Sequence, residues 1–445
     1  TQLSWNDVND WFPAVSETGH LLFARWDYID RDAVTHQNLW SMRPDGTNPM
    51  AVWGNESPKP HCTFQAKGVP GGSKIVCVAS AHHAITGGPV ILIDPTVDNN
   101  SLKAVTRVTP EPFPEAEGMR EIPFYNSPWP LSDSLFLVAF SHEGLRYQGH
   151  GERGIFNSDD ALGLYVLDAK GNRELIYRDP EIGAYSPIPL RARKMPPVLP
   201  SNLDAKLAER KLGEVFITDI YEGLPNCVRG TIKKLRIVQV FPKTTRDANN
   251  PRIGVAGEEN ARAVLGETEV LPDGSARFFV PAGKPFYFQA LDEEGLAYRT
   301  MRSSTSLMPG ERVSCVGCHE NKMTVSVKAG KTAEAMKRPA AELSPTRESG
   351  RPYGYAENVQ PVWDKHCLRC HSGDKPSGGI DLSGKPLGQH TASYFNLCWT
   401  NRVDGKLDRR VGRKSGKTIV PCYAQRNQVQ VTPEGGGNAA LGSPL

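Results

Sequence analysis

The first 180 residues repeat one pattern, in which short apolar runs alternate with polar turns. The fullest copy has apolar runs at Trp11–Ser16 and Leu21–Ala24, followed by Leu39–Gly46. A second copy spans 71–78 and 90–94, and a third spans 132–138 and 164–171. Each copy contains a strand after a polar turn and then a second strand followed by Asp. The pattern therefore predicts β-hairpins, three times over.

The turns that end these copies include Asp45-Gly46 and Lys170-Gly171. Such pairs favour tight hairpins, because glycine accepts a positive φ. The repeat resembles the blades of periplasmic, Tol-associated β-propellers; the alternative is three unrelated hairpins. Propellers close with about four to eight blades. We therefore expect further blades upstream of Thr1, or ring segments whose pattern is not readable.

The rest of the chain also favours β structure. Pro196–Pro200 predicts a linker. Four apolar runs then predict a compact β-sandwich or barrel: 213–217, 235–240, 276–280 and 285–291. Thr324–Gly354 predicts an exposed connection, and Tyr355–His366 a short helix. The Gly-rich tail after Val431 predicts little order.

Composition narrows the class of protein. The 36 prolines and 42 glycines indicate many turns and disfavour long helices. A net charge of only +3 gives no electrostatic reason to expect binding to nucleic acid or anionic membrane. No apolar run reaches the roughly 18 residues that a membrane-spanning helix needs. The N-terminal sequence is not a signal peptide.

Two C-x-x-C-H motifs carry the most specific chemistry. This motif attaches haem c: the two thiols add to the haem vinyl groups, and the adjacent His becomes the proximal iron ligand. The predicted attachment residues are Cys315, Cys318, His319, Cys367, Cys370 and His371. The rival interpretations are zinc, which does not require the following His, and thiol redox chemistry, which would need a βαβ context. Two covalent haems place the protein in the periplasm or another extracytoplasmic compartment.

We therefore predict a mainly β protein with a partial propeller, a β-sandwich-like middle domain and a small, mostly helical or irregular haem c region. The predicted divisions are 1–195 for the blades, 196–323 for the middle domain with the first haem site, 324–354 for a linker and 355–445 for the second haem site.

The sixth iron ligand decides what each haem can do, because a vacant position permits substrate binding and two strong ligands favour electron transfer. His390 and Met323 are the metal-ligand candidates beyond the motifs, and His390 is equally interpretable as a surface residue. Met301, Met308 and the propeller residues His82 and His83 are weaker candidates for the first haem. Adjacent strand residues face opposite sides, so at most one of the two histidines could reach a given site.

Five cysteines lie outside the motifs, and an odd number cannot all pair within one chain. Cys62 could pair with Cys77, and Cys398 with Cys422, in an oxidising compartment. Cys227 is then either a small buried apolar residue or a metal ligand. An additional zinc or calcium ion is a further cofactor that we consider.

The order of blades, β-rich middle domain and two haem motifs resembles the α subunit of hydrazine synthase and its dihaem relatives. The local signatures are Arg25–Arg31, Ala81–His83, Leu271–Ala276, Leu291–Asp292, Met301–Ser303 and Cys315–Glu320. The resemblance implies nitrogen chemistry at the first haem, electron transfer at the second, and other haem-bearing or redox subunits as partners.

This chain departs from that family in two places. A Tyr four residues after the first motif His binds iron in the family, and the chain has Met323 there. This departure argues against hydrazine synthesis itself and leaves His319 as the ordinary proximal ligand. The family takes the distal His of its second haem from a segment well past the motif; either His390 substitutes or the natural chain runs beyond Leu445, and we favour the second.

The sequence therefore supports two alternative functions. One is a dihaem oxidoreductase subunit whose first haem binds small nitrogen species. The alternative is a non-catalytic electron-transfer or scaffold subunit. Fold resemblance alone does not fix the reaction.

Overall fold

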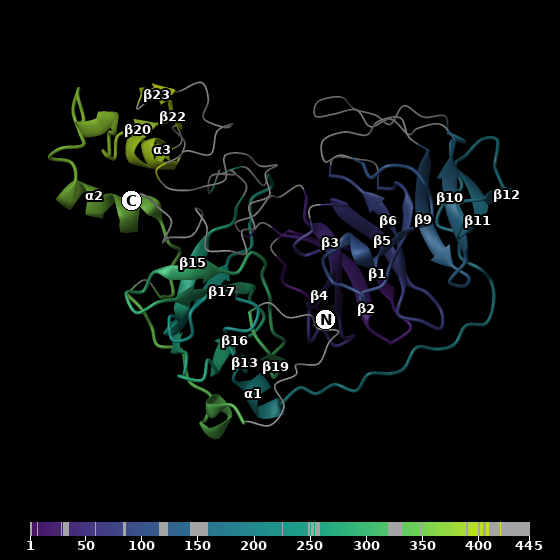
Figure 1. Cartoon of the computed structure of the whole chain (residues 1–445), viewed down its shortest axis with the longest axis horizontal. Coiled ribbons are helices and arrows are strands. Elements are labelled where there is room, and N and C mark those ends of the chain that lie inside the picture. Colours follow the sequence, from purple (N-terminus) through teal and green to yellow (C-terminus); the bar gives the residue numbers. More distant parts are fainter. Residues whose placement is uncertain are drawn as a thin grey trace. The chain divides into compact units, whose positions relative to one another are not determined.

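The computed structural model describes residues 2–6, 8–27, 29, 35–57, 59–82, 86–114, 123–142, 159–224, 226–247, 250, 253, 259–318, 332–347, 349–388, 390–398, 401–403, 406–408 and 419. The chain forms two compact units. Unit 1 comprises Thr1–Asp27, Ala33–Leu203 and Asn321–Val327, and unit 2 comprises Tyr28–Asp32, Asp204–Glu320 and Lys328–Leu445. Most of unit 1 is coloured purple to blue in Figure 1, and most of unit 2 teal to yellow.

The described part of unit 1 consists of three successive four-stranded antiparallel meanders (Figure 1). A single residue pair, Gln37 with Cys62, joins the first two into one eight-stranded sheet. The first meander is β1(Asn9–Val15), β2(Leu21–Trp26), β3(Gln37–Met42) and β4(Met50–Trp53). The second is β5(Cys62–Gly68), β6(Ile75–Ser80), β7(Val90–Ile93) and, after η1(Leu102–Ala104), β8(Val105–Arg107). The third is β9(Phe124–Pro130), β10(Leu135–Ser141), β11(Gly163–Asp168) and β12(Arg173–Tyr177).

The hairpin turns fall where the sequence predicts them. Gly46 lies in the β3–β4 turn with φ 84°, and Gly171 in the β11–β12 turn with φ 87°. An Asp at or just after the end of each third strand holds the following turn. Asp45, Asp94 and Asp168 each accept a hydrogen bond from the backbone N–H two residues later, at 3.1, 3.1 and 2.9 Å. The repeat read from the sequence is therefore a repeat in the structure.

The meanders pack face to face. One face of the second meander contributes Val76 and Val78 to a cluster that also contains Phe136 and Val138 of the third. Its other face contributes Cys77 to a cluster with Leu39 of the first meander. Each meander thus behaves as a blade, and we use that word below. The described strands form no closed ring, and the propeller itself stays a prediction.

The sheet also explains why one predicted disulfide is wrong. Cys62 and Cys77 are both buried and free. Cys62 packs into the cluster shared by blades 2 and 3, whereas Cys77 packs into the cluster shared by blades 1 and 2. Their side chains lie on opposite faces of one sheet, so no rotamer change could join them. Cys398 is buried and free, and its predicted partner Cys422 lies outside the described residues.

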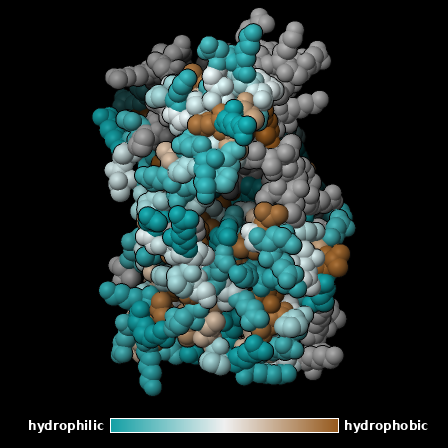
Figure 2. Space-filling view, turned by 90° about the vertical axis from the view of Figure 1, so that its left-hand side faces the viewer, coloured by the Kyte–Doolittle hydropathy of each residue, from teal (hydrophilic) through white to brown (hydrophobic). Residues whose placement is uncertain are grey.

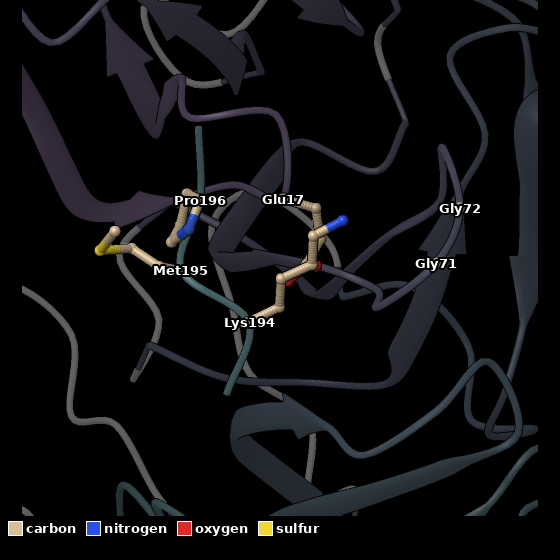
Figure 3. Close-up of a pocket in the computed structure, with 6 residues that line it drawn as sticks. All are labelled: Glu17, Gly71, Gly72, Lys194, Met195 and Pro196. Atoms are coloured by element: carbon tan, nitrogen blue, oxygen red, sulfur yellow. The ribbon is translucent and has the colours of Figure 1, made fainter. Parts of the chain in front are cut away.

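The segment after blade 3 is bound to unit 1 rather than loose. The backbone carbonyl of Pro197 lies against Gly19, where a side chain would clash with it. Arg43 donates a hydrogen bond to the carbonyl of Pro200. A pocket of about 340 Å³ lies beside this segment, lined by Glu17, Gly71, Gly72, Lys194, Met195 and Pro196. The side chains of Lys194 and Glu17 overlap in the view of Figure 3, whereas Met195 points to the opposite side.

Unit 2 is built around two sheets. One has the order β16-β13-β19 and the other β15-β14-β17-β18. Inward residues of both, such as Val215, Phe278, Ile237 and Phe286, share one buried cluster, which makes this region the predicted sandwich. The elements are α1(Ala205–Glu209), β13(Leu212–Ile217), β14(Lys234–Val240), β15(Arg262–Glu269), β16(Ala276–Pro281), β17(Phe286–Leu291), β18(Ala297–Thr300) and β19(Arg312–Cys315).

The predicted linker 324–354 is described from residue 332 on. It is mostly exposed, but hydrogen bonds attach it to the sandwich. Ala341 N–H donates to the Arg277 carbonyl at 2.9 Å, and Ser344 N–H to the Glu267 carbonyl at 2.8 Å. These contacts cover free edges of β16 and β15, which limits edge-to-edge pairing with other chains.

The last part of unit 2 is small. Its elements are η2(Glu334–Lys337), the π-helical turn η3(Tyr355–Val359), α2(Gln360–His366), η4(Ser377–Gly379), β20(Pro386–Leu387), β21(His390–Thr391), α3(Ala392–Cys398), β22(Asn401–Val403) and β23(Lys406–Asp408). The predicted short helix is therefore present as η3 and α2. Within the described ranges, no helix is long and apolar enough to span a membrane. The face in Figure 2 is largely hydrophilic outside its grey atoms, with apolar residues in separate small groups.

Candidate haem-binding sites

Strand β19 delivers the first motif. It pairs in parallel with β13, and the last pair of the register is Ile217 with Cys315. Beyond these two residues, backbone hydrogen bonds still join the two segments, which continue as loops. Thr218 N–H donates to the Cys315 carbonyl at 2.9 Å, and Asp219 N–H to the Val316 carbonyl at 2.9 Å. Cys318 N–H donates to the Glu222 carbonyl at 3.0 Å. Both cysteines of the motif are thus held through their backbone by residues 218–222, which we call the cradle.

Gly317 makes this cradle possible. A Cβ at this position would lie 2.3 Å from the Glu222 carbonyl oxygen and 2.5 Å from the Glu222 Cβ. These distances are far inside van der Waals contact, and the obstructing oxygen belongs to the backbone. The second of the two residues between the cysteines, at position 317, must therefore be glycine for the loop to close over the motif.

An ion pair supports the same loop. The Arg229 guanidinium bonds both carboxylate oxygens of buried Asp219, at 2.6 and 3.1 Å, and lies over the Tyr221 ring. Asp219 also accepts the Tyr221 N–H at 3.1 Å. Hydrogen bonding to Asp219 raises the pKa of Arg229. Bidentate geometry with a buried carboxylate fixes orientation as well as contributing energy.

The cysteine at 227 lies near this motif. It packs against the sandwich core, as Cys315 does, and burial raises the pKa of its thiol. Burial, followed by the proximity of Cys315 and Cys227, raises the pKa of the Cys318 thiol to about 12, although Cys318 retains contact with solvent. Among the residues that the structure describes, no group of three or more His, Cys, Asp or Glu side chains is placed to hold a metal ion.

The second motif follows helix α2 directly. Cys370 N–H and His371 N–H both donate to the Cys367 carbonyl, at 3.1 and 2.9 Å, so a single turn carries all three attachment residues. Cys370 is exposed and Cys367 is half-buried, which leaves the thiols accessible. Cys367 packs against a small apolar cluster that includes Trp363, Leu382 and Leu397.

The His371 ring is held in one orientation. Its Nδ1 lies 3.2 Å from the backbone carbonyl of Ile380. A carbonyl can only accept, so Nδ1 must carry the proton in this hydrogen bond, and Nε2 is then the unprotonated nitrogen. Metal-binding histidines are commonly oriented in this way by a carbonyl on the other ring nitrogen. The donor set and the tautomer both fit a proximal ligand of haem iron.

The predicted ligand His390 lies on β21 in an aromatic group. Its ring stacks on Tyr394, with centroids 4.9 Å apart and planes at 28°. Tyr394 meets Tyr355 edge-on at 5.0 Å, and the Tyr355 hydroxyl accepts the Trp363 indole N–H at 2.9 Å. Burial raises the pKa of Tyr355. The role of His390 as an iron ligand stays a prediction.

The other predicted iron ligands either pack elsewhere in the molecule or lie outside the described residues. His319, Met323 and His83 lie outside the described residues. Met308 is buried, and Met301 packs against the apolar cluster around Tyr287. His82 is buried in unit 1, where its Nδ1 lies 2.8 Å from Gln37 Nε2. The sequence did not predict the cradle of residues 218–222 or the contact with the Ile380 carbonyl, because backbone contacts do not require particular residue types. The one sequence feature that indicates close packing is the glycine inside the first motif.

Comparisons with known proteins agree with the family resemblance that the sequence indicated. Residues 230–320, which contain most of the sandwich and the first motif, match the family model of the hydrazine synthase alpha subunit middle domain. Hydrazine synthase subunit alpha of Kuenenia stuttgartiensis is 24% identical over 540 aligned residues, covering 95% of this chain and 61% of the relative. The resemblance is to the hydrazine synthase α subunit.

The fold agrees with that resemblance. The solved hydrazine synthase of Kuenenia stuttgartiensis superposes with a TM-score of 0.67 at 18% identity, covering 91% of this chain and 61% of the matched chain. At this identity the match shows the fold alone. The chain therefore has a mainly β, hydrazine synthase α-like fold, and it spans about 61% of the length of the curated relative it matches.

Proposed function

We propose that this chain is a dihaem c-type oxidoreductase subunit that works outside the cytoplasm with other haem-bearing or redox subunits. The observation that carries the proposal is the second motif, where one turn presents two accessible thiols and an imidazole whose Nδ1 is held by the Ile380 carbonyl. The resemblance to hydrazine synthase subunit alpha, which covers 95% of this chain, supports haem at both motifs.

The residues would divide the work as follows. Cys315 and Cys318, and Cys367 and Cys370, would hold one haem each through thioether links, with His319 and His371 as proximal ligands. Haem iron, when bound, supplies reversible electron transfer and a site for small ligands. The Ile380 carbonyl selects the neutral tautomer of His371 in which Nδ1 carries the proton, and the cradle holds the backbone of Cys315 and Cys318 in place. Small nitrogen species are the proposed ligands at the first site.

The alternative is a non-catalytic electron-transfer or scaffold subunit. The sequence observation that favours it is Met323, which replaces the tyrosine that the family uses as an iron ligand. A high-spin component in the resting ferric spectrum would support the oxidoreductase, because it marks an iron with a weak or vacant sixth position.

Haem stoichiometry tests the proposal. Mass spectrometry of the denatured protein, expressed with a haem c attachment system, should show two added haem masses. Replacing Cys367 and Cys370 by Ala should remove one, and replacing Cys315 and Cys318 the other. The matched control is Cys227→Ala, which removes a non-motif thiol and should leave both. A wild-type protein with one haem or none would refute the proposal.

A further inference from the structure

The pocket beside the segment after blade 3 is formed by three separate parts of unit 1. The turn between β1 and β2 contributes one residue, the turn between β5 and β6 two, and the segment itself three (Figure 3): Glu17, Gly71, Gly72, Lys194, Met195 and Pro196. Its volume of about 340 Å³ lies in the range of small-molecule sites, roughly 300–1,000 Å³. Both haem motifs belong to unit 2, so this pocket is no part of the sites described above.

The segment that carries Lys194 is held on both sides of this residue. Just before it, the Arg193 guanidinium lies over the Trp129 ring of β9, 5.0 Å from the ring centroid. A cation at this distance from an indole is attracted to the face of the ring. Just after it, the Pro197 carbonyl lies against Gly19 in the β1–β2 turn. The pocket is therefore formed before any ligand enters.

Lys194 is the cation of this segment that the blades do not use. The Arg191 guanidinium donates to the Leu131 carbonyl at 3.1 Å, and Arg193 lies over Trp129. The Lys194 ammonium, in contrast, makes no ion pair or hydrogen bond within the described part of the chain. Its charge lines the pocket without a protein partner.

Glu17 is in the same position on another wall. Its neighbours bond one another, since the Ser16 and Thr18 hydroxyls lie 3.0 Å apart and the Thr18 hydroxyl lies 3.1 Å from His20 Nδ1. The Glu17 carboxylate makes no ion pair or hydrogen bond with any described residue, Lys194 included. One pocket thus contains a carboxylate and an ammonium that do not neutralise each other.

We propose that this pocket binds a small zwitterion, such as an amino acid, whose carboxylate pairs with Lys194 and whose ammonium pairs with Glu17. A ligand with a single charge would leave one of these two side chains unpaired, whereas a zwitterion gives each a charge-assisted hydrogen bond. The glycine turn leaves room for it. A Cβ at Gly71 would meet nothing within 4 Å, and one at Gly72 only the Lys74 nitrogen at 3.9 Å.

A series of amino acids tests the charge pairing. Glycine, β-alanine and γ-aminobutyrate carry the same two charges at increasing separation. At least one of them should bind the 445-residue chain saturably in a ligand-observed NMR titration. Both side chains are exposed, so we expect a dissociation constant on the order of millimolar. Acetate and ethylamine, which carry one charge each, should bind on the order of tenfold more weakly.

Variants then locate the binding. Lys194→Met and Glu17→Gln should each weaken it on the order of tenfold and leave the Tm unchanged, because both side chains are exposed. The matched controls Lys103→Met and Glu174→Gln remove exposed charges elsewhere in unit 1 and should bind as the wild type does. Three results would overturn the proposal: no saturable binding of any of the three amino acids, unchanged binding in both pocket variants, or equally tight binding of acetate or ethylamine.

Discussion

At the residue scale, the backbone arrangement of the first motif depends on the absence of a side chain at Gly317. Strand β19 and the loop 218–222 run together closely enough that Cys318 can bond the Glu222 carbonyl, and only glycine at 317 leaves room for that carbonyl. The motif requires Cys315, Cys318 and His319 but says nothing of the residues between them. The choice of Gly317 is therefore a matter of packing rather than of haem chemistry, and it can be tested separately.

Gly317→Ala should weaken unit 2. The added Cβ meets the Glu222 backbone at 2.3 Å, which the chain can relieve only by moving a strand end. Overpacking of this kind costs about 1–3 kcal/mol, measurable by urea unfolding, and haem mass at the first motif should fall with it. Gly354→Ala is the control in the same unit, because its Cβ would meet only the flexible end of Glu357. Equal stability of the two variants would contradict the packing argument.

At the scale of elements, the sequence predicted the strands and turns that are specified by local patterns of apolar and turn residues. The apolar runs predicted in the first 180 residues are strands β1, β2, β3, β6, β7, β10 and β11, the four predicted runs of the sandwich are β13, β14, β16 and β17, and the turns at Gly46 and Gly171 are present. The sequence did not predict the other blade strands, which are β4, β5, β8, β9 and β12. The parallel pairing of β13 with β19 could not be predicted, since about 95 residues separate the strands. Nor could the bulges at Gln65 and Ser127, because neither residue type signals a positive φ.

The turn aspartates give the blades an acid-sensitive component. Hydrogen bonds, first from the Thr96 hydroxyl, hold the pKa of Asp94 below its ordinary 3.8. A group whose pKa is depressed on folding stabilises the fold above its unfolded pKa, and this stabilisation is lost as pH falls through the folded pKa. Unit 1 should therefore lose stability as pH drops below about 3.8, and Asp94→Asn should flatten that dependence in thermal unfolding between pH 6 and 2. The control Asp133→Asn changes an exposed turn carboxylate and should leave the slope as it is. An unchanged slope in Asp94→Asn would argue against the hydrogen-bonded turn.

At the scale of the whole molecule, both predicted haem motifs belong to unit 2, whereas the blades form unit 1. The two motifs also have different settings, since one ends a sandwich strand and the other ends helix α2. The sequence predicts all the attachment residues, because the motif is local, and their attachment to haem stays a prediction. It could not assign the sixth iron ligands, because such side chains can come from segments distant in the sequence; the candidate Met323 lies outside the described residues, and His390 is stacked on Tyr394.

Small-ligand binding should distinguish the two motifs. Residues 303–309, which lead into the first motif, contain no histidine, and Met308 is buried. The first iron is therefore expected to keep a weak or vacant sixth position, where cyanide or nitric oxide can bind. Cyanide should shift the Soret band of the two-haem protein. The shift should persist when Cys367 and Cys370 are replaced by Ala and disappear when Cys315 and Cys318 are replaced instead. If neither ligand perturbs either haem, both irons are closed, and the electron-transfer subunit becomes the better description of this chain.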